Sequence, residues 1–153
     1  MMTISTRKIL KVALIITVSL LAVFFLVSCG DSSQPNTSRG IEVSQAMLSN
    51  IASGLTVSGG GSLRDGWAVK SNDFNSLYFI AAEIDGPGLE GNGEIGLWAT
   101  NRLEPGQGLI LSVDSFAKEF SVWPHGDTTD SNITQFDDGA DEAKMCVRNS
   151  QGD

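Results

Sequence analysis

The chain has few of the residues that build disulfide frameworks and metal centres, because its 153 residues include only two cysteines and one histidine. Two cysteines cannot form the disulfide framework typical of small secreted domains. A transition-metal site built on His125 and at most one spare thiol is not expected. No Ser–His–acid set is recognisable around His125. The sequence therefore shows no legible catalytic constellation, and it favours a protein that is not an enzyme.

One long apolar run stands near the N-terminus. Residues 12–27 are mostly apolar, and Arg7, Lys8 and Lys11 precede them with no acid before Asp31. The run is slightly longer than the core of a secretory signal, about 7–15 residues, and shorter than the roughly 20 residues of a membrane-spanning helix. Its length alone leaves both interpretations open. The basic flank places that end in the cytoplasm and the rest of the chain outside.

The end of this run decides between the two. Leu26-Val27-Ser28-Cys29 resembles the lipobox of bacterial lipoproteins, which ends in a small residue followed by cysteine. The resemblance covers residues 1–29 and implies that the chain is cut between Ser28 and Cys29. It also implies that the Cys29 sulfur carries a diacylglyceryl group, so that Cys29 is the lipidated N-terminus. Two acyl chains give stable anchoring where one does not.

The chain after residue 28 is strongly acidic, with 7 Lys and Arg against 18 Asp and Glu. This net charge near −11 repels phosphate backbones, so nucleic acid is not an expected partner. It also repels anionic headgroups, so attachment to the membrane must be covalent rather than electrostatic. Residues 29–40 lack apolar side chains after Cys29 and are predicted to be a flexible tether. With Cys29 lipidated, Cys146 has no intrachain disulfide partner and is expected either in the core or as a reactive thiol.

Residues 41–153 are predicted to form one small α+β domain. A helix is expected over 41–55, with Ser44 as a plausible N-cap and Gly54 as terminator. Apolar patterning predicts a mainly antiparallel sheet of three to four strands, with short connections between them. The segment 77–85 is apolar on both faces and is expected to be a central strand. The strands are expected at 67–70, 77–85, 94–100 and 109–113.

Two helices are expected to pack on this sheet. The first follows Asp114 or Ser115 and places Phe116, Phe120 and Trp123 on one face toward the sheet. The second covers 139–148, with Asp138 as its cap. Its thin apolar face consists of Ala140, Ala143 and Val147.

Candidate ligand-binding residues are few. Asp85 and Glu94 flank one loop at strand ends, where two carboxylates suit Ca²⁺ or the acid and base of a glycosidase. Trp98 lies opposite an apolar strand face and is a candidate platform for a sugar ring, unless both faces of the sheet are covered. Two G-x-G-x-x-G patterns within 86–96 lead into a strand, which favours a hairpin loop over a dinucleotide site.

The domain resembles small secreted or lipid-anchored proteins of actinobacteria and their relatives in 79–88 and 96–101. This resemblance spans about 63–147 and implies no activity. The sequence predicts a lipid-anchored extracytoplasmic protein of the cell membrane, non-enzymatic, that binds an envelope protein or a small ligand. Calcium binding, carbohydrate binding and hydrolysis by the strand-end carboxylates are alternatives, and Ca²⁺ is the only cofactor that these residues suggest. The strand-end carboxylates are Glu83, Asp85, Glu94 and Asp114.

Overall fold

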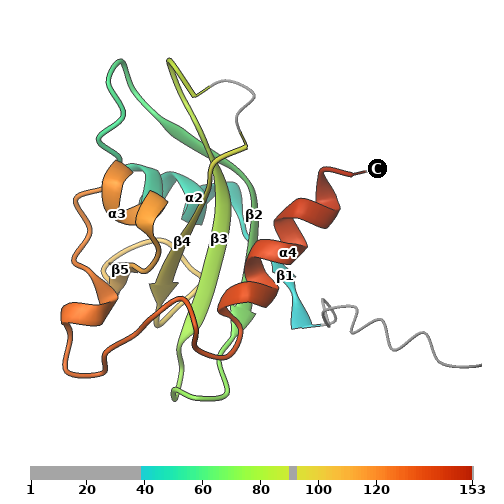
Figure 1. Cartoon of the computed structure of the whole chain (residues 1–153), viewed down its shortest axis with the longest axis vertical. Helices are drawn as coiled ribbons and strands as arrows, with labels where there is room; N and C mark the ends of the chain where they lie inside the picture. The colour runs from blue at the N-terminus through green and yellow to red at the C-terminus, as the bar shows by residue number, and fades with distance from the viewer. Residues whose placement is uncertain (1–38, 90–92, 153) are drawn as a thin grey trace, which may run out of the picture. The chain divides into compact units, whose positions relative to one another are not determined.

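The computed structural model describes residues 39–89 and 93–152, all within one compact unit of residues 35–153. Five antiparallel strands form one sheet in the order β1-β2-β3-β4-β5 (Figure 1). The α+β class and the antiparallel meander are confirmed. The strands are β1 (Ile41–Glu42), β2 (Ser62–Lys70), β3 (Tyr78–Asp85), β4 (Ile95–Thr100) and β5 (Ile110–Ser112).

The central strand β3 is buried on both faces, as its unbroken apolar sequence predicts. It pairs with β2 on one side and β4 on the other, in registers that include Phe79 opposite Val69 and opposite Ala99. Phe79 and Ile80 have no exposed surface although they point to opposite faces. Both faces of the sheet are therefore covered.

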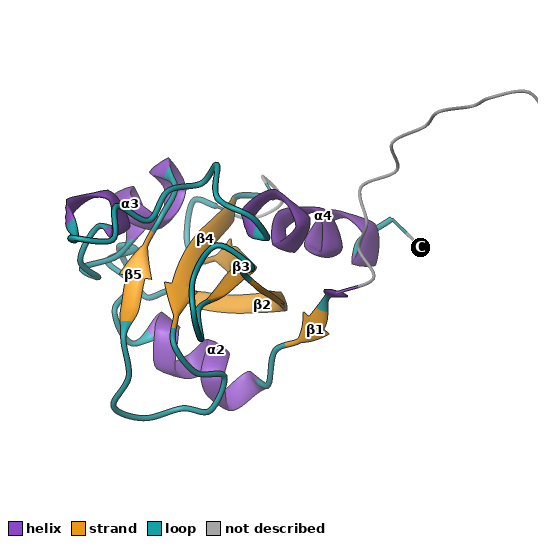
Figure 2. Ribbon diagram, turned by 90° about the horizontal axis from the view of Figure 1, so that it is seen from below, coloured by secondary structure: helices purple, strands orange, loops and turns teal. Residues whose placement is uncertain are grey.

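Helices on the two faces enclose two separate cores. Helix α4 (Ala140–Ser150) covers one face, and α2 (Gln45–Ala52) covers the other (Figure 2). Short α3 (Ser115–Phe120) lies beside β4 and β5 and contributes buried Ala117 to the core under α2. The apolar face predicted for the last helix is confirmed, since Ala140, Ala143 and Val147 are all fully buried in the core under α4.

The predicted helix over 41–55 is too long at its N-terminus. Ile41 and Glu42 instead form β1, which pairs with Ala68 and Trp67 of β2 and gives the sheet a fifth strand. The Ser44 cap is confirmed, because its side chain accepts a hydrogen bond from the Met47 N–H. An N-cap residue has an extended backbone, so the helix cannot begin before it.

The helix predicted after Asp114 is wrong in its extent and right only in part in its face, because Phe120 and Trp123 pack against the core under α2 while Phe116 is exposed. The helix ends at Phe120 because Ser121 is extended, so Trp123 lies beyond it and donates from Nε1 to the Ile51 carbonyl at 2.9 Å. Phe116 is 38% exposed, and it is Ala117 that packs inward. The predicted cap of the last helix is also wrong: Gly139 occupies the N-cap position, and the Asp138 side chain pairs with Arg39.

Candidate functional site

The outer edge of β2 is only partly covered. Strand β1 pairs with Trp67 and Ala68 alone, and the Val43 N–H adds one hydrogen bond to the Gly66 carbonyl at 2.9 Å. Within the part of the chain that the structure describes, Ser62, Leu63 and Arg64 pair with β3 on one side and with no strand on the other. The sheet thus presents a short open edge at this point.

A β-bulge shapes this edge. The register between β2 and β3 shifts between Arg64 and Trp67, and Asp65 has a φ of 53°. Gly66 lies so close to α2 that a Cβ there would be 2.5 Å from Leu48 Cδ2. The missing side chain lets the bulge approach the helix, which is a typical use of glycine inside a strand.

A hollow of about 640 Å³ lies where this edge meets α2. The β1–α2 junction, the bulge and Ser150 near the end of α4 line it. Leu48 and the half-buried Trp67 give it an apolar wall, while exposed Glu42 and Asp65 give it an acidic rim. We call this hollow the edge groove. Its surface thus combines aromatic, apolar and charged side chains.

Arg64, on the rim of the edge groove, forms ion pairs with acids of the same chain. Its guanidinium donates to the buried carboxylate of Glu83 and lies 3.3 Å from Asp65 and 4.0 Å from Asp85. Glu83 also accepts a hydrogen bond from Gln151. Arg64 shares its single positive charge among these carboxylates, so the rim formed by Glu42, Arg64 and Asp65 is net negative.

The structure does not bring Asp85 and Glu94 together as a site. Glu83 is opposite Ile95 in the β3–β4 register, so Asp85 lies on the Glu83 face and Glu94 on the other. No group of three or more His, Cys, Asp or Glu side chains among the described residues is placed to hold a metal ion. The paired-carboxylate interpretation therefore fails here, for calcium and for glycoside hydrolysis alike.

Trp98 is not a sugar platform. Its side chain has no exposed surface, and its ring lies in the core under α2. A Cβ on Gly96 would lie 2.4 Å from the ring, so the glycine makes room for it. Because both faces of the sheet are covered, the apolar alternation around Trp98 reflects packing rather than ligand binding.

Asp114, another of the candidate carboxylates, stabilises the fold. Its side chain is 1% exposed and accepts hydrogen bonds from the Leu97 N–H and the Ala117 N–H. Lys144 of α4 lies 2.5 Å from its other oxygen. The expectation that Asp114 caps a helix is confirmed, and the buried ion pair uses its remaining acceptor.

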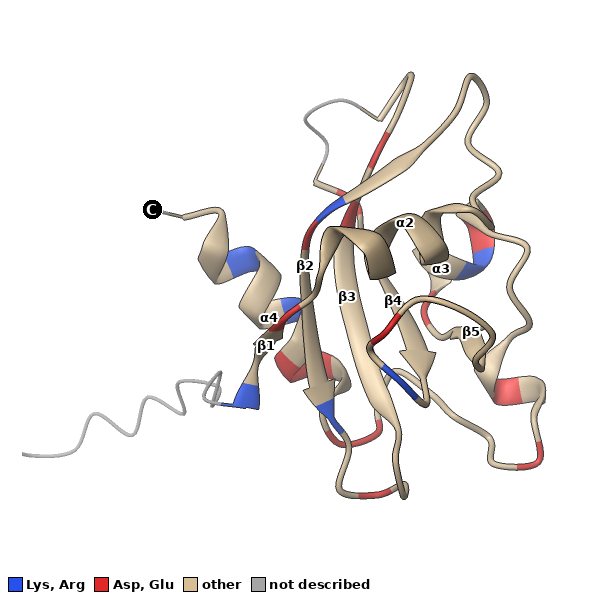
Figure 3. Ribbon diagram, turned by 180° about the vertical axis from the view of Figure 1, so that it is seen from behind, with Lys and Arg blue, Asp and Glu red and all other residues tan. Residues whose placement is uncertain are grey.

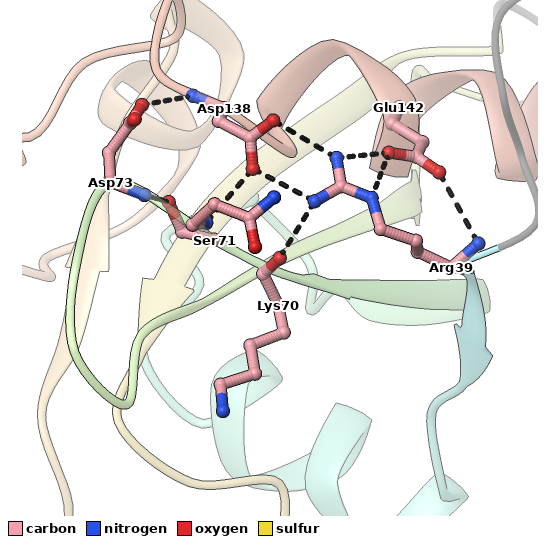
Figure 4. Close-up of polar contacts among 7 residues, drawn as sticks. Arg39, Lys70, Ser71, Asp73, Asp138 and Glu142 are labelled. Carbon is pink, nitrogen blue, oxygen red and sulfur yellow. Dashed lines mark hydrogen bonds and ion pairs between the residues drawn. The ribbon is translucent and has the colours of Figure 1, made fainter.

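Arg39 forms the densest polar cluster in the described residues (Figure 4). Its guanidinium donates to Asp138 from Nη1 and Nη2, at 2.9 and 3.1 Å, and to Glu142 from Nε and the same Nη2, at 2.9 and 2.5 Å. It also donates to the Lys70 carbonyl at 3.3 Å. Asp138 in turn accepts from the Asn72 N–H at 2.9 Å. Arg39 was predicted to belong to the tether, yet it joins the start of the described chain to β2 and α4.

We expect Arg39→Ala to reduce the free energy of unfolding by about 1 kcal/mol at pH 7, the value of a partly exposed ion pair. The Arg39 guanidinium, followed by the Asn72 N–H, lowers the pKa of Asp138 below its usual range. This contribution is present above the unfolded carboxyl pKa of about 3.9 and is lost as the pH falls through the lowered folded value. Denaturant unfolding from pH 7 to pH 2 should show a shallower acid loss in Arg39→Ala than in the unsubstituted chain.

The remaining residues singled out in the sequence are Cys146, His125, Ser28 and Cys29. Cys146 is 5% exposed in α4, and burial raises the pKa of its thiol, which favours the core alternative over a reactive thiol. His125 begins a 3-10 turn at Gly126–Thr128 and is exposed. Ser28 and Cys29, with most of the predicted tether, lie outside the described residues.

Comparisons with protein families, curated proteins and solved structures found no match to this chain. Within residues 39–89 and 93–152, no helix has the length and apolar character needed to cross a membrane. Sequence reasoning missed the edge groove, although Gly66 inside a strand pattern is a signal for a bulge. It missed the Arg39 cluster because its members are about 100 positions apart.

Proposed function

We propose that this protein is a lipid-anchored, extracytoplasmic binding module without catalytic activity, attached to the membrane through Cys29. Its partner is another polypeptide of the cell envelope, which binds in the edge groove. The observation that carries the proposal is the groove itself, with an open strand edge, an apolar wall at Leu48 and Trp67, and an acidic rim. An extended segment adds to such an edge through main-chain hydrogen bonds.

The charge of the domain favours a basic partner segment. The described residues contain more acids than bases, and acidic residues gather at both ends of the sheet (Figure 3). Four of the bases, Arg39, Arg64, Lys118 and Lys144, already pair with acids of the same chain. The rim of the groove, with Glu42 and Asp65 against Arg64 alone, is net negative, and this charge raises the association rate of a cationic partner.

The hydrolase alternative finds no support in the four strand-end carboxylates. Glu83 pairs with Arg64 and Asp114 with Lys144, while Asp85 and Glu94 lie on opposite faces of the sheet. A general acid and base must share one cleft with their substrate. None of these four side chains lines the edge groove.

Photo-crosslinking in intact cells tests the proposal. A benzoyl-phenylalanine at the exposed position 42 is expected to form one defined crosslinked protein product, because this position lies on the rim of the edge groove. The same residue at exposed position 130, away from the groove, is the control and should form none. The product should weaken when Asp65→Asn is added. Absence of any product at position 42, or equal products at both positions, would contradict the groove as the binding site.

The anchor is checked in the same cells. Metabolic labelling with a fatty acid should label the unsubstituted chain and leave Cys29→Ala unlabelled and larger, because the signal is not removed. A labelled and processed Cys29→Ala product would overturn the anchor and leave the crosslinking result to stand alone.

A further inference from the structure

Phe136 is the most exposed large apolar side chain among the described residues, at 88%. The turn that carries it is held by its own hydrogen bonds. The Asp137 carboxylate accepts from the Thr134 N–H at 2.7 Å, and the Phe136 N–H donates to Thr134 Oγ1 at 3.3 Å. Because the turn is closed in this way, it presents the ring to the surroundings and does not fold it back on the domain.

This turn lies beside the start of the described chain. Asp138 follows Phe136 by two residues, and its carboxylate binds the Arg39 guanidinium at 2.9 Å. The Asp138 N–H donates to Asp73 in the β2–β3 turn at 2.8 Å, so both turns lie at this end of the sheet (Figures 1 and 4). The exposed ring is thus displayed close to the point where any N-terminal attachment reaches the domain.

The length of chain before Arg39 limits the distance to the membrane. Ten peptide steps separate Cys29 from Arg39, and they span at most about 35 Å when fully extended. A coil of that length has an average span of about 17 Å. Lipidation of Cys29 would therefore keep the end of the domain that carries Phe136 next to the lipid headgroups.

We propose that the Phe136 turn is a second membrane contact, and that its ring inserts into the interfacial region of the bilayer that holds Cys29. This inference rests on the proposed lipid anchor. Burial of an aromatic ring at the bilayer interface is favourable. A single ring is weak in isolation, but the anchor converts its binding into an intramolecular step with a high effective concentration. The contact would fix which face the domain turns toward the bilayer.

The negative charge of the domain determines which lipid headgroups favour this contact. Asp137 and Asp138 follow Phe136 directly; Asp138 is paired with Arg39, and Asp137 accepts hydrogen bonds from the backbone N–H and the hydroxyl of Thr134. The surplus negative charge of the domain is repelled by anionic headgroups. The contact is therefore stronger on zwitterionic phosphatidylcholine than on bilayers rich in phosphatidylglycerol.

Tryptophan fluorescence of the full acylated protein, purified from membranes and reconstituted in vesicles, tests the contact. Phe136→Trp is compared with the unsubstituted chain in vesicles containing brominated phosphatidylcholine. The added emission should be quenched and blue-shifted, and the quenching should fall as phosphatidylglycerol is added. The matched control is Val122→Trp, since Val122 is 71% exposed and its N–H bonds Gly54, on the side of the domain where α2 ends. Its added emission should not be quenched.

Flotation of the vesicles separates the two proposals. If the unsubstituted chain floats with the lipid and neither variant is quenched, the contact is overturned and the anchor stands. Equal quenching of both variants also overturns it, because the domain would then lie on the bilayer without a preferred face. If the unsubstituted chain does not float, the anchor is overturned and the second contact with it. A shift of the Phe136→Trp emission that requires added membrane proteins assigns the turn to a protein partner and overturns the lipid contact.

Discussion

Asp114→Ala is expected to lower the free energy of unfolding by about 3–5 kcal/mol, because it leaves the largely buried Lys144 ammonium without its carboxylate partner. The Asp114 side chain is 1% exposed and the Lys144 side chain 17% exposed, and their charged atoms are 2.5 Å apart. Removal of the carboxylate also leaves the buried N–H groups of Leu97 and Ala117 without their acceptor. The measurement is denaturant unfolding at neutral pH, followed by far-ultraviolet circular dichroism.

Two variants separate the charge from the cap. Asp114→Asn keeps a side-chain acceptor for the two N–H groups and should lose less stability than Asp114→Ala. The double variant Asp114→Ala with Lys144→Met should lose less than the two single losses combined, since no charge is left unpaired. Lys118→Ala breaks an exposed pair with Asp127 and should change stability little. A loss of under about 1 kcal/mol in Asp114→Ala would show that the buried pair contributes little.

Trp98→Ala is expected to cost about 3–5 kcal/mol, the range for removal of a buried aromatic side chain. The ring is fully buried, packs against Gly96 and donates from Nε1 to Ser121 Oγ at 3.4 Å. A surface platform for a sugar would instead lose binding and keep its stability. Thermal unfolding monitored by circular dichroism distinguishes the two roles.

Matched substitutions sharpen this result. Trp98→Phe keeps part of the ring's volume and should cost less than Trp98→Ala. Phe136→Ala removes an aromatic ring that is 88% exposed and should leave the melting temperature nearly unchanged. If Trp98→Ala and Phe136→Ala gave equal melting temperatures, Trp98 could not be part of the core.

Local patterns were sufficient for much of the fold. Four strands, the burial of β3 on both faces, the Ser44 cap and the Asp114 cap were all predictable, because each depends on residues a few positions apart. Strand β1 was missed because two residues carry too little periodicity to compete with the helical pattern that follows them. Its pairing partners, Ala68 and Trp67, lie far along the chain.

The candidate residues were predictable only in part. Trp98 follows the same alternating pattern whether its face is solvated or covered, so the pattern alone could not place it. Asp85 and Glu94 do flank one loop, but the odd or even offset in the β3–β4 register decides which face each side chain takes. Which faces of the sheet the helices bury, and which register β3 and β4 adopt, both depend on packing over the whole sheet.

By itself the sequence determined the strand order along the meander, the two caps and the prediction of a lipidated Cys29. Only the tertiary structure decided that Arg39 belongs to the domain, that Asp114 forms an ion pair with Lys144, and that residues of β2 and α2 together line the edge groove. The physical reason is the range of the interactions. Hydrophobic period and capping are local, whereas ion pairs and grooves depend on which distant segments the two cores bring together.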